Sequence, residues 1–387
     1  MRLDEYAAAS MQNDPAPDPI SDRDRYSRQI LFPGIGVLGQ QRLAAAHVAI
    51  VGCGATGAAA ASLLARAGAG TLTLIDRDFV EPSNLQRQLL FDEADARASL
   101  PKAEAARRHI ALFNSSIAVH ARIADLTPAN IAELLLPAGH PPPQILLDAT
   151  DNFETRYLLN DFAVQQSIPW IYAAAVGAYA ATMNILPGKH GLGAPSMAQS
   201  HRDMDGNVYS PTACLSCIFP TSPTGPADTC DTAGILSTAV NLAASIQVTE
   251  ALKFLTGQPQ LMRRTLLSFD LWSNERSEIA AAKPRPGCTV CGQRVFAHLT
   301  GNARPHITLC GRDSVQIHER HRPIDLGQMR VRLAQHADIS DLRCNELLLR
   351  FRRGPHTFTL FPDGRALIQG TTDPAVARSL YARFIGS

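Results

Sequence analysis

Several side chains that can donate hydrogen bonds to phosphate oxygens follow a short apolar strand, Thr71–Ile75, which leads into Asp76. These residues are Asn84, Arg87, Gln88 and Lys102. Fixed cations and amide donors of these types stabilise the charge that develops on a reacting phosphate. Hydride transfer by a nicotinamide cofactor needs none of them near its adenine half. Any one could be an ordinary solvated side chain, but their grouping favours phosphoryl or nucleotidyl transfer.

A glycine turn precedes these residues. Gly52, Gly54 and Gly57 have the spacing G-x-G-x-x-G between an apolar strand and an alanine-rich helix. Glycines there let the backbone turn tightly and approach a phosphate at the helix N-terminus. Asp76 follows about 20 residues later, where an acid holds a ribose hydroxyl. The turn could instead only pack the helix against the strand, and the motif alone does not separate NAD from ATP.

A second acidic segment, Asp148-Ala-Thr-Asp151-Asn152, follows another apolar strand. The carboxyl ends of strands in a parallel sheet meet at the edge where such sheets bind ligands. A carboxylate beside a triphosphate is suited to holding Mg²⁺, so Asp151 is a candidate magnesium ligand. The spacing is equally compatible with Asp151 as the N-cap of the next helix.

The chain has eight cysteines, and four of them form two C-x-x-C pairs. These pairs are Cys214 with Cys217 and Cys288 with Cys291. Together they offer the four thiolates of a tetrahedral structural zinc site, which would attach a lid segment to the end of the main domain. Two reducible disulfides or four buried thiols are the less favoured alternatives.

Cys230 is a lone cysteine just before a predicted helix. That position can lower a thiol pKa, which makes Cys230 a weak candidate nucleophile. Lone cysteines are more often inert packing residues, and we interpret Cys53, Cys310 and Cys344 in that way.

Strands and helices alternate along most of the chain. This order predicts an α/β fold with a doubly wound, mainly parallel, Rossmann-like sheet and a zinc-stapled lid region. The lid is predicted at 188–233, where Gly, Pro, Ser and Thr dominate without a hydrophobic period. The predicted helices are Lys102–Leu112, Asn152–Gln166 and Ile235–Leu255, the last closed by Gly257.

We divide the chain into three parts. Residues 1–24 form a disordered or loosely attached lead-in, and 25–294 form the main domain. Residues 306–387 form a small α+β domain with a helix over Leu326–His336. It also contains a hairpin with an Asp-Gly turn and a last helix capped at Asp373.

Composition excludes several classes of protein. Lys+Arg number 36 and Asp+Glu 35, so no overall basic field favours nucleic acid or an acidic membrane surface. No apolar run reaches the roughly 20 residues that a membrane-spanning helix needs. The N-terminus lacks the pattern of a signal peptide, and we expect a cytoplasmic protein.

Taken together, the motifs from about Arg25 to Arg294 resemble the ThiF/MoeB/HesA family, bacterial relatives of ubiquitin-activating enzymes. The matching segments, in order, are RYSRQ, GCGATG, IDRDFVEPSNLQRQ, LPKAEAA, DATDNFETR, CLSC, TCDTAG, EALKFLTG and PGCTVCG. In the glycine turn this chain has Ala55-Thr56 where the family usually has Gly-Leu. The region 188–213 is longer than is usual in the family.

The resemblance implies a homodimeric enzyme that uses ATP and Mg²⁺, with a structural Zn²⁺. It would adenylate the C-terminal Gly-Gly carboxylate of a small β-grasp sulfur carrier, ThiS-like or MoaD-like, for thiamine or molybdopterin synthesis. In the family, Gly52, Gly54 and Gly57 match the phosphate-side loop and Asp76 the ribose ligand. Positions matching the phosphate grip are Asn84, Arg87, Gln88 and Lys102.

Three further residues acquire roles from the resemblance alone. Asp151 matches the family's magnesium-linked acid, and Arg28 matches an arginine that relatives contribute to the partner's ATP across the dimer. Cys230 matches the cysteine of the family's thiol step. The C-terminal domain does not resemble the rhodanese domain fused to some relatives. It is similar to a small extension on other bacterial members, to which we give a carrier- or partner-binding role. The sulfur is therefore expected from a separate sulfurtransferase or cysteine desulfurase.

Three alternatives stay open. An NAD(P)-dependent oxidoreductase explains the glycine turn and Asp76, but it leaves Arg87, Lys102 and the cysteine quartet unexplained. A non-catalytic scaffold would have no chemical reason to keep these charged residues. Adenylation of another substrate, such as a tRNA base or a peptide, would use the same fold but gives Cys230 no clear task.

Overall fold

The computed structural model describes residues 21–188, 201–202, 208–221, 233–300, 308–309, 314–317, 324–362, 364–371 and 373–386. Most of the predicted lead-in and much of the predicted lid fall outside these ranges. Cys230 and Cys310 also lie outside them. Within the described residues, no helix is both long and apolar enough to cross a membrane.

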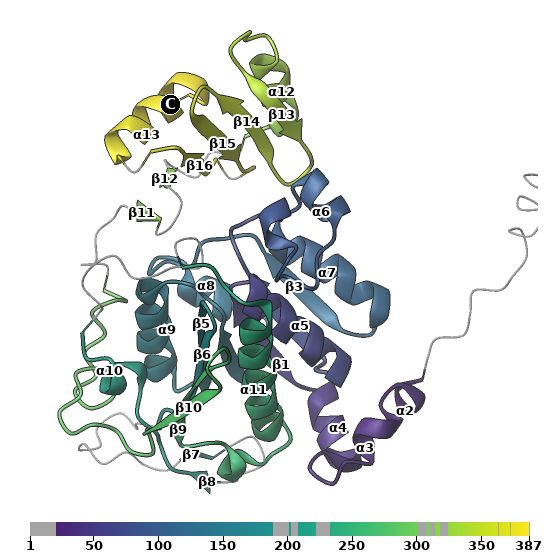
Figure 1. Ribbon diagram of the computed structural model, residues 1–387, viewed down its shortest axis with the longest axis vertical. Helices are drawn as coiled ribbons and strands as arrows, with labels where there is room; N and C mark the ends of the chain where they lie inside the picture. The colour runs from purple at the N-terminus through teal and green to yellow at the C-terminus, as the bar shows by residue number, and fades with distance from the viewer. Residues whose placement is uncertain are drawn as a thin grey trace, which may run out of the picture.

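A central sheet of eight strands organises the main part of the chain, in the order β10-β9-β6-β5-β4-β1-β2-β3 (Figure 1). Neighbouring strands from β3 through β5 pair in parallel, whereas β6, β9 and β10 extend the sheet in antiparallel fashion. The prediction of a mixed α/β fold with a mainly parallel sheet is confirmed. The strands are β1 (His47–Val51), β2 (Thr71–Ile75), β3 (Ala118–Arg122), β4 (Ile145–Asp148), β5 (Trp170–Val176), β6 (Tyr179–Ile185), β9 (Thr265–Asp270) and β10 (Glu275–Ala280).

Helices cover both faces of this sheet because side chains alternate along each strand. Val48 and Ile50 of β1 face one core, and Ala49 and Val51 face the other. Helices α5, α7 and α11 contribute to the first core, and α8 and α9 to the second. The described helices and 3-10 turns of this part are α2 (Asp22–Arg25), α3 (Ser27–Ile30), α4 (Gly36–Ala44), α5 (Ala55–Ala67), η1 (Pro82–Asn84), α6 (Glu93–Ala98), α7 (Lys102–Phe113), α8 (Ile131–Leu135), α9 (Phe153–Gln166), α10 (Leu215–Ile218), α11 (Ser237–Leu255) and η2 (Pro259–Leu261).

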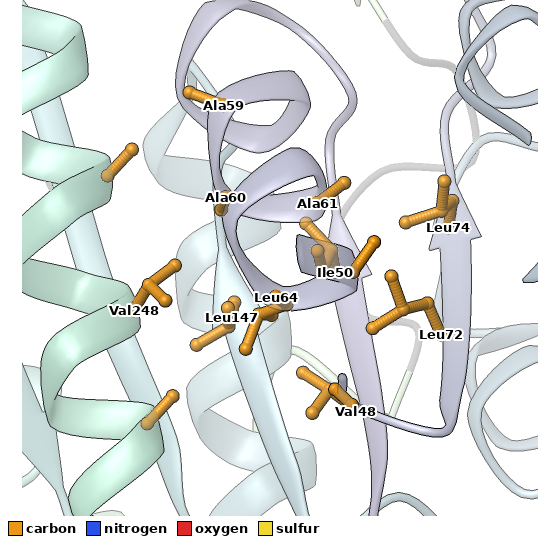
Figure 2. Close-up of a cluster of buried hydrophobic side chains, with 14 of the residues drawn as sticks. Val48, Ile50, Ala59, Ala60, Ala61, Leu64, Leu72, Leu74, Leu147 and Val248 are labelled. Carbon is orange, nitrogen blue, oxygen red and sulfur yellow. The ribbon is translucent and has the colours of Figure 1, made fainter. Parts of the chain in front are cut away.

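The first core is built around α5 (Figure 2). Ala60 and Leu64 of α5 are fully buried, together with Leu72 of β2 and Leu147 of β4. Val248 of α11 closes the cluster from the other side. The alanines let α5 lie close to the sheet, and each large apolar side chain buried there contributes roughly 1.5–3 kcal/mol. This packing fixes the N-terminus of α5 at the carboxyl edge of the sheet.

A separate six-stranded antiparallel sheet forms the C-terminal part, in the order β11-β12-β16-β15-β14-β13. It has its own core, in which Phe351, Phe358 and Ile368 are fully buried. The predicted hairpin is confirmed as β15 and β16, and Asp373 caps the last helix as expected. The elements are β11 (Thr308–Leu309), β12 (Ser314–Ile317), α12 (Leu326–Leu333), β13 (Ser340–Cys344), β14 (Leu349–Arg353), β15 (His356–Leu360), β16 (Ala366–Gln369) and α13 (Pro374–Phe384); a two-stranded ladder, β7 (His201–Arg202) with β8 (Val208–Tyr209), completes the description.

Candidate functional site

One pocket at the carboxyl edge of the central sheet brings together residues from several separate stretches of sequence. The glycine turn follows β1, Asp76 follows β2, and the Asp151 segment follows β4. Lys102, at the start of α7, also lines the pocket. The predicted site residues that line the pocket are Gly52, Gly54, Asp76, Arg87, Gln88, Lys102 and Asp151.

The three glycines of the turn serve different purposes. Gly52 has φ +91°, and a Cβ there would lie 2.5 Å from the Ala149 carbonyl oxygen. A Cβ on Gly57 would lie 2.0 Å from the Gly52 oxygen, so this glycine permits close packing and does not line the pocket. A Cβ on Gly54 would meet only the Gln88 amide, at 4.0 Å. The space above Gly54, next to the N–H groups of the first turn of α5, therefore suits an anion.

Backbone N–H groups hold both carboxylate oxygens of Asp76. Its Oδ2 accepts a hydrogen bond from the Cys53 N–H at 2.5 Å, and its Oδ1 accepts one from the Asp78 N–H at 2.7 Å. Burial raises the pKa of Asp76 above the ordinary carboxyl value, and the nearby Lys102 ammonium opposes that rise. A carboxyl fixed in this way presents acceptor oxygens to a ligand hydroxyl.

Lys102 is 4% exposed, although it carries a charge. Its Nζ lies 3.0 Å from Asp78 Oδ2, and its backbone N–H donates to the Asp78 carbonyl. Asp78 also lines the pocket, yet our reading of the sequence did not single it out. The signal was available, since Asp78 stands two positions after Asp76 in the IDRD segment.

The amide oxygen of Gln88 is buried without a hydrogen-bond donor among the described residues. The residue is 2% exposed and lines the pocket, and its Oε1 has no hydrogen-bond partner among the described residues. Leaving such an atom unsatisfied costs about 1–3 kcal/mol. A ligand that supplies a donor would relieve that cost, so this atom is consistent with a polar ligand in the pocket.

Arg87 and Asn84 differ in how they meet the pocket. Arg87 lines it, half-buried, while its Nη1 donates to the Ser83 carbonyl at 2.8 Å. Asn84 is fully buried and is not among the lining residues. Its Oδ1 instead accepts from the Glu81 N–H at 3.1 Å, which fixes the η1 turn, and its backbone carbonyl accepts from the N–H groups of Arg87 and Gln88.

The turn after β4 is organised by a buried ion pair. Arg156 Nε donates to Asp148 Oδ2 at 3.1 Å, and its Nη2 donates to the carbonyls of Thr150 and Ala173. Burial raises the pKa of Asp148, opposed by the Arg156 charge. Asp148 is therefore a structural acid, which leaves Asp151 as the exposed carboxylate of this segment.

Asn152, and not Asp151, caps the following helix. Asn152 Oδ1 accepts from the Thr155 N–H at 2.8 Å, and α9 begins at Phe153. The alternative that Asp151 serves as the N-cap is wrong, because the chain needs one more extended residue before the helix starts. Asp151 stays available at the pocket wall.

A second ion pair, also absent from our sequence reading, borders the Asp76 side of the pocket. Arg77 Nη1 lies 2.8 Å from Asp125 Oδ1, and both residues line the pocket. The two residues lie in the segments that follow the neighbouring strands β2 and β3, which the pairing of these strands brings together.

The two C-x-x-C pairs form one cluster away from this pocket. Their four Sγ atoms all lie within 4.8 Å of one another, with separations such as 3.4 Å between Cys217 and Cys291. Cys214 lies 3.7 Å from both Cys217 and Cys288. Tetrahedral zinc with Zn–S bonds near 2.3 Å requires sulfur separations of roughly 3.8 Å. The disulfide alternative is wrong, because all four cysteines are free.

Arg28 lies on α3 and is exposed, outside the lining of the pocket. Apolar side chains are exposed just after α3 and on α4: Leu31 is 71% exposed, Phe32 63% and Leu38 68%. One chain alone therefore does not bring Arg28 to the predicted site.

Comparison with known proteins identifies the family to which this chain belongs. The model of the ThiF family matches residues 26–290, which hold the glycine turn, most of the pocket lining and three of the four clustered cysteines. The chain belongs to the ThiF family. This agrees with the resemblance that the motifs indicated.

Named relatives of this ThiF-family chain include adenylyltransferases. It is 42% identical over 365 residues to the sulfur carrier protein ThiS adenylyltransferase of Bacillus subtilis (strain 168), covering 94% of this chain and 99% of the relative. It is 33% identical over 271 residues to the SAMP-activating enzyme E1 of Haloferax volcanii, covering 70% of this chain and 89% of the relative. A structure of E. coli MccB with ATP has a similar fold, with a TM-score of 0.55 at 24% identity over 70% of this chain and 74% of MccB.

Proposed function

We propose that this protein adenylates the C-terminal Gly-Gly carboxylate of a small β-grasp sulfur carrier with ATP. The proposal depends chiefly on one observation: Gly54, Asp76, Lys102 and Asp151 converge on a single pocket. A nicotinamide oxidoreductase would account for the first two but not for the other two. The relatives named as ThiS adenylyltransferase and SAMP-activating enzyme support the carrier as substrate.

The predicted site residues at the pocket each have a task in this reaction. The turn at Gly52 and Gly54 and the N-terminus of α5 receive the phosphates, and Asp76 accepts a hydrogen bond from the ribose. Arg87, Lys102 and the amide N–H of Gln88 donate to the phosphate oxygens. The remaining members of the predicted grip support them from outside the pocket wall, Asn84 through the η1 turn and Gly57 through the packing of α5.

The chemical step is an in-line displacement at the α-phosphorus. A carboxylate oxygen of the carrier forms a bond to that phosphorus, and the bond to the bridging oxygen breaks. Pyrophosphate leaves with the electron pair, and the carrier becomes a mixed anhydride with AMP. Orientation and positive charge supply most of the catalysis in such transfers, and no general base is needed because the nucleophile is already ionised.

Magnesium fits the acidic side of the pocket. Asp151 is exposed at the wall, and the hydrogen bond described for its carboxylate is a long one, 3.4 Å from Asn152 Nδ2. Carboxylate oxygen is a ligand that Mg²⁺ prefers. Bound there, the ion would offset the charge of the phosphates.

The remaining assignments follow the family. We place the adenylation domain at 25–294 and the small domain at 306–387, and we expect a cytoplasmic homodimer in which Arg28 reaches the partner's ATP. The exposed apolar side chains Leu31, Phe32 and Leu38, which follow Arg28 in the chain, are suited to such an interface. Cys230 would take part in the later thiol step, with sulfur from a separate sulfurtransferase or cysteine desulfurase. The 42% identity to a ThiS adenylyltransferase favours a ThiS-like carrier and the thiamine route over a MoaD-like carrier.

Intact-mass analysis of the carrier tests the proposal. With ATP and this protein, a ThiS-like carrier should gain the mass of one AMP moiety. The same carrier without its last two glycines should stay unmodified, since it offers no carboxylate at the right reach. Modification of the truncated carrier, or of neither, would contradict the proposal.

We also propose a structural zinc ion at the cysteine cluster. The sulfur separations of 3.4–3.7 Å suit tetrahedral coordination, and the cluster joins α10 to residues 288–291. The purified protein should contain about one zinc per chain. Cys288→Ser should lose the metal and lower the melting temperature, whereas the matched control Cys344→Ser should keep it. Metal analysis that finds equal zinc in both variants would refute the assignment.

A further inference from the structure

Strand β16 of the small domain has two faces with different surroundings. Ala366 and Ile368 are fully buried in the small domain's own core. Leu367 and Gln369, which alternate with them, are not in that core and instead line the pocket of the main domain. Side chains alternate across a strand, so this division is a property of the β16 backbone. The small domain thus supplies part of the wall of the candidate site.

A buried anchor fixes β16 at the pocket. Arg365 is 7% exposed, and its Nη2 donates to the Ile123 carbonyl at 2.6 Å. Phe361 and Leu348 of the small domain form an apolar cluster with Phe79, which also lines the pocket. Figure 1 places the small domain beside α6, and hydrogen bonds confirm this contact, from Arg343 and Asn345 to the carbonyls of Arg97 and Ala98.

The place of this anchor indicates which part of a ligand β16 meets. Ile123 directly follows β3, and the next residues, Ala124–Leu126, line the pocket. In the sheet, β3 lies beside β2, which Asp76 directly follows, and is separated from β4 by both β1 and β2. The anchored strand therefore approaches from the Asp76 side. The glycine turn and Asp151 follow β1 and β4, farther from the anchor.

We infer that Leu367 and Gln369 of β16 contact the nucleoside half of bound ATP, so that the small domain is a nucleotide-positioning wall of the adenylation site. Leu367 supplies apolar surface, and the Gln369 amide supplies a hydrogen bond to the ribose or the base. The inference rests on the proposed use of ATP by this pocket. It gives the C-terminal domain a task in the reaction distinct from the carrier- or partner-binding role suggested by resemblance.

The test compares ATP affinity in the absence of any carrier. Leu367→Ala and Gln369→Ala should each raise the Kd for ATP by about 3- to 10-fold, the effect of one lost contact. Ser379→Ala, an exposed position on α13 of the same domain, should leave it unchanged. The KM for the carrier should stay the same in all three variants. In the wild type, ATP should slow hydrogen exchange in peptides that span 364–371.

Two results would overturn the inference. One is wild-type ATP affinity in both β16 variants together with no ATP-dependent protection of 364–371. The other is a change confined to the KM for the carrier, which would assign β16 to the carrier's tail. Because ATP affinity is measured without a carrier, it remains informative even if carrier adenylation itself fails.

Discussion

Lys102→Ala is expected to lower carrier adenylation by about 10²–10³-fold, the loss typical of removing one fixed group that stabilises developing charge. The ammonium is 4% exposed and lies in the pocket wall beside Asp78. Its removal subtracts a cation from the phosphate site and leaves the Asp78 carboxylate without that partner. The variant should therefore lose turnover more than it loses affinity for ATP.

A control on the same helix separates this effect from a general disturbance of α7. Arg108→Ala also removes a cation, but Arg108 is half-exposed and pairs with Glu104. Its rate should stay within about twofold of the wild type, as expected for a surface ion pair. Steady-state adenylation rates of both variants, with thermal melting to confirm the fold, make the comparison. Equal rates for Lys102→Ala and the wild type would remove Lys102 from the mechanism.

Arg156→Leu is expected to destabilise the protein by about 3–5 kcal/mol, because it removes one partner of a buried ion pair. The guanidinium is 5% exposed and bonds Asp148, Thr150 and Ala173, so its loss strands a buried carboxylate and two carbonyls. Arg156→Lys should recover only part of that loss, since an ammonium cannot reproduce the fork of the guanidinium.

Urea unfolding monitored by circular dichroism measures this change. The double variant Asp148→Asn/Arg156→Leu should be more stable than Arg156→Leu alone, because no buried charge is then left unpaired. Near-wild-type stability of the Arg156→Leu variant would contradict the structural role assigned to the pair.

The sequence predicted the local features of the site well because short-range rules govern them. The glycine spacing predicted the turn, and Gly52 and Gly57 do occupy positions that exclude a Cβ. Asp76 follows its strand as expected. Asp373 caps the last helix, again a rule that acts over a few residues.

What the sequence did not predict depends on contacts between distant segments. Arg156 stands in the DATDNFETR segment, but its three partners come from β4, the turn after it and β5. The pairing of Arg77 with Asp125 requires the register of two strands. The arrival of Leu367 and Gln369 at the pocket requires the packing of one domain on another, which no local pattern encodes. The cap of the helix after β4 is Asn152, one residue later than the candidate Asp151, a shift that spacing alone did not resolve.

ATP–pyrophosphate exchange tests the central claim most directly, because it follows formation and reversal of the mixed anhydride. Exchange should require both a carrier that ends in Gly-Gly and Asp151, and it should survive Cys230→Ala, which would place the cysteine in a later step. Asp151→Ala should fold normally, since the side chain is exposed, and should lose exchange. Absence of exchange with every Gly-Gly carrier, in a protein that binds ATP, would contradict the account.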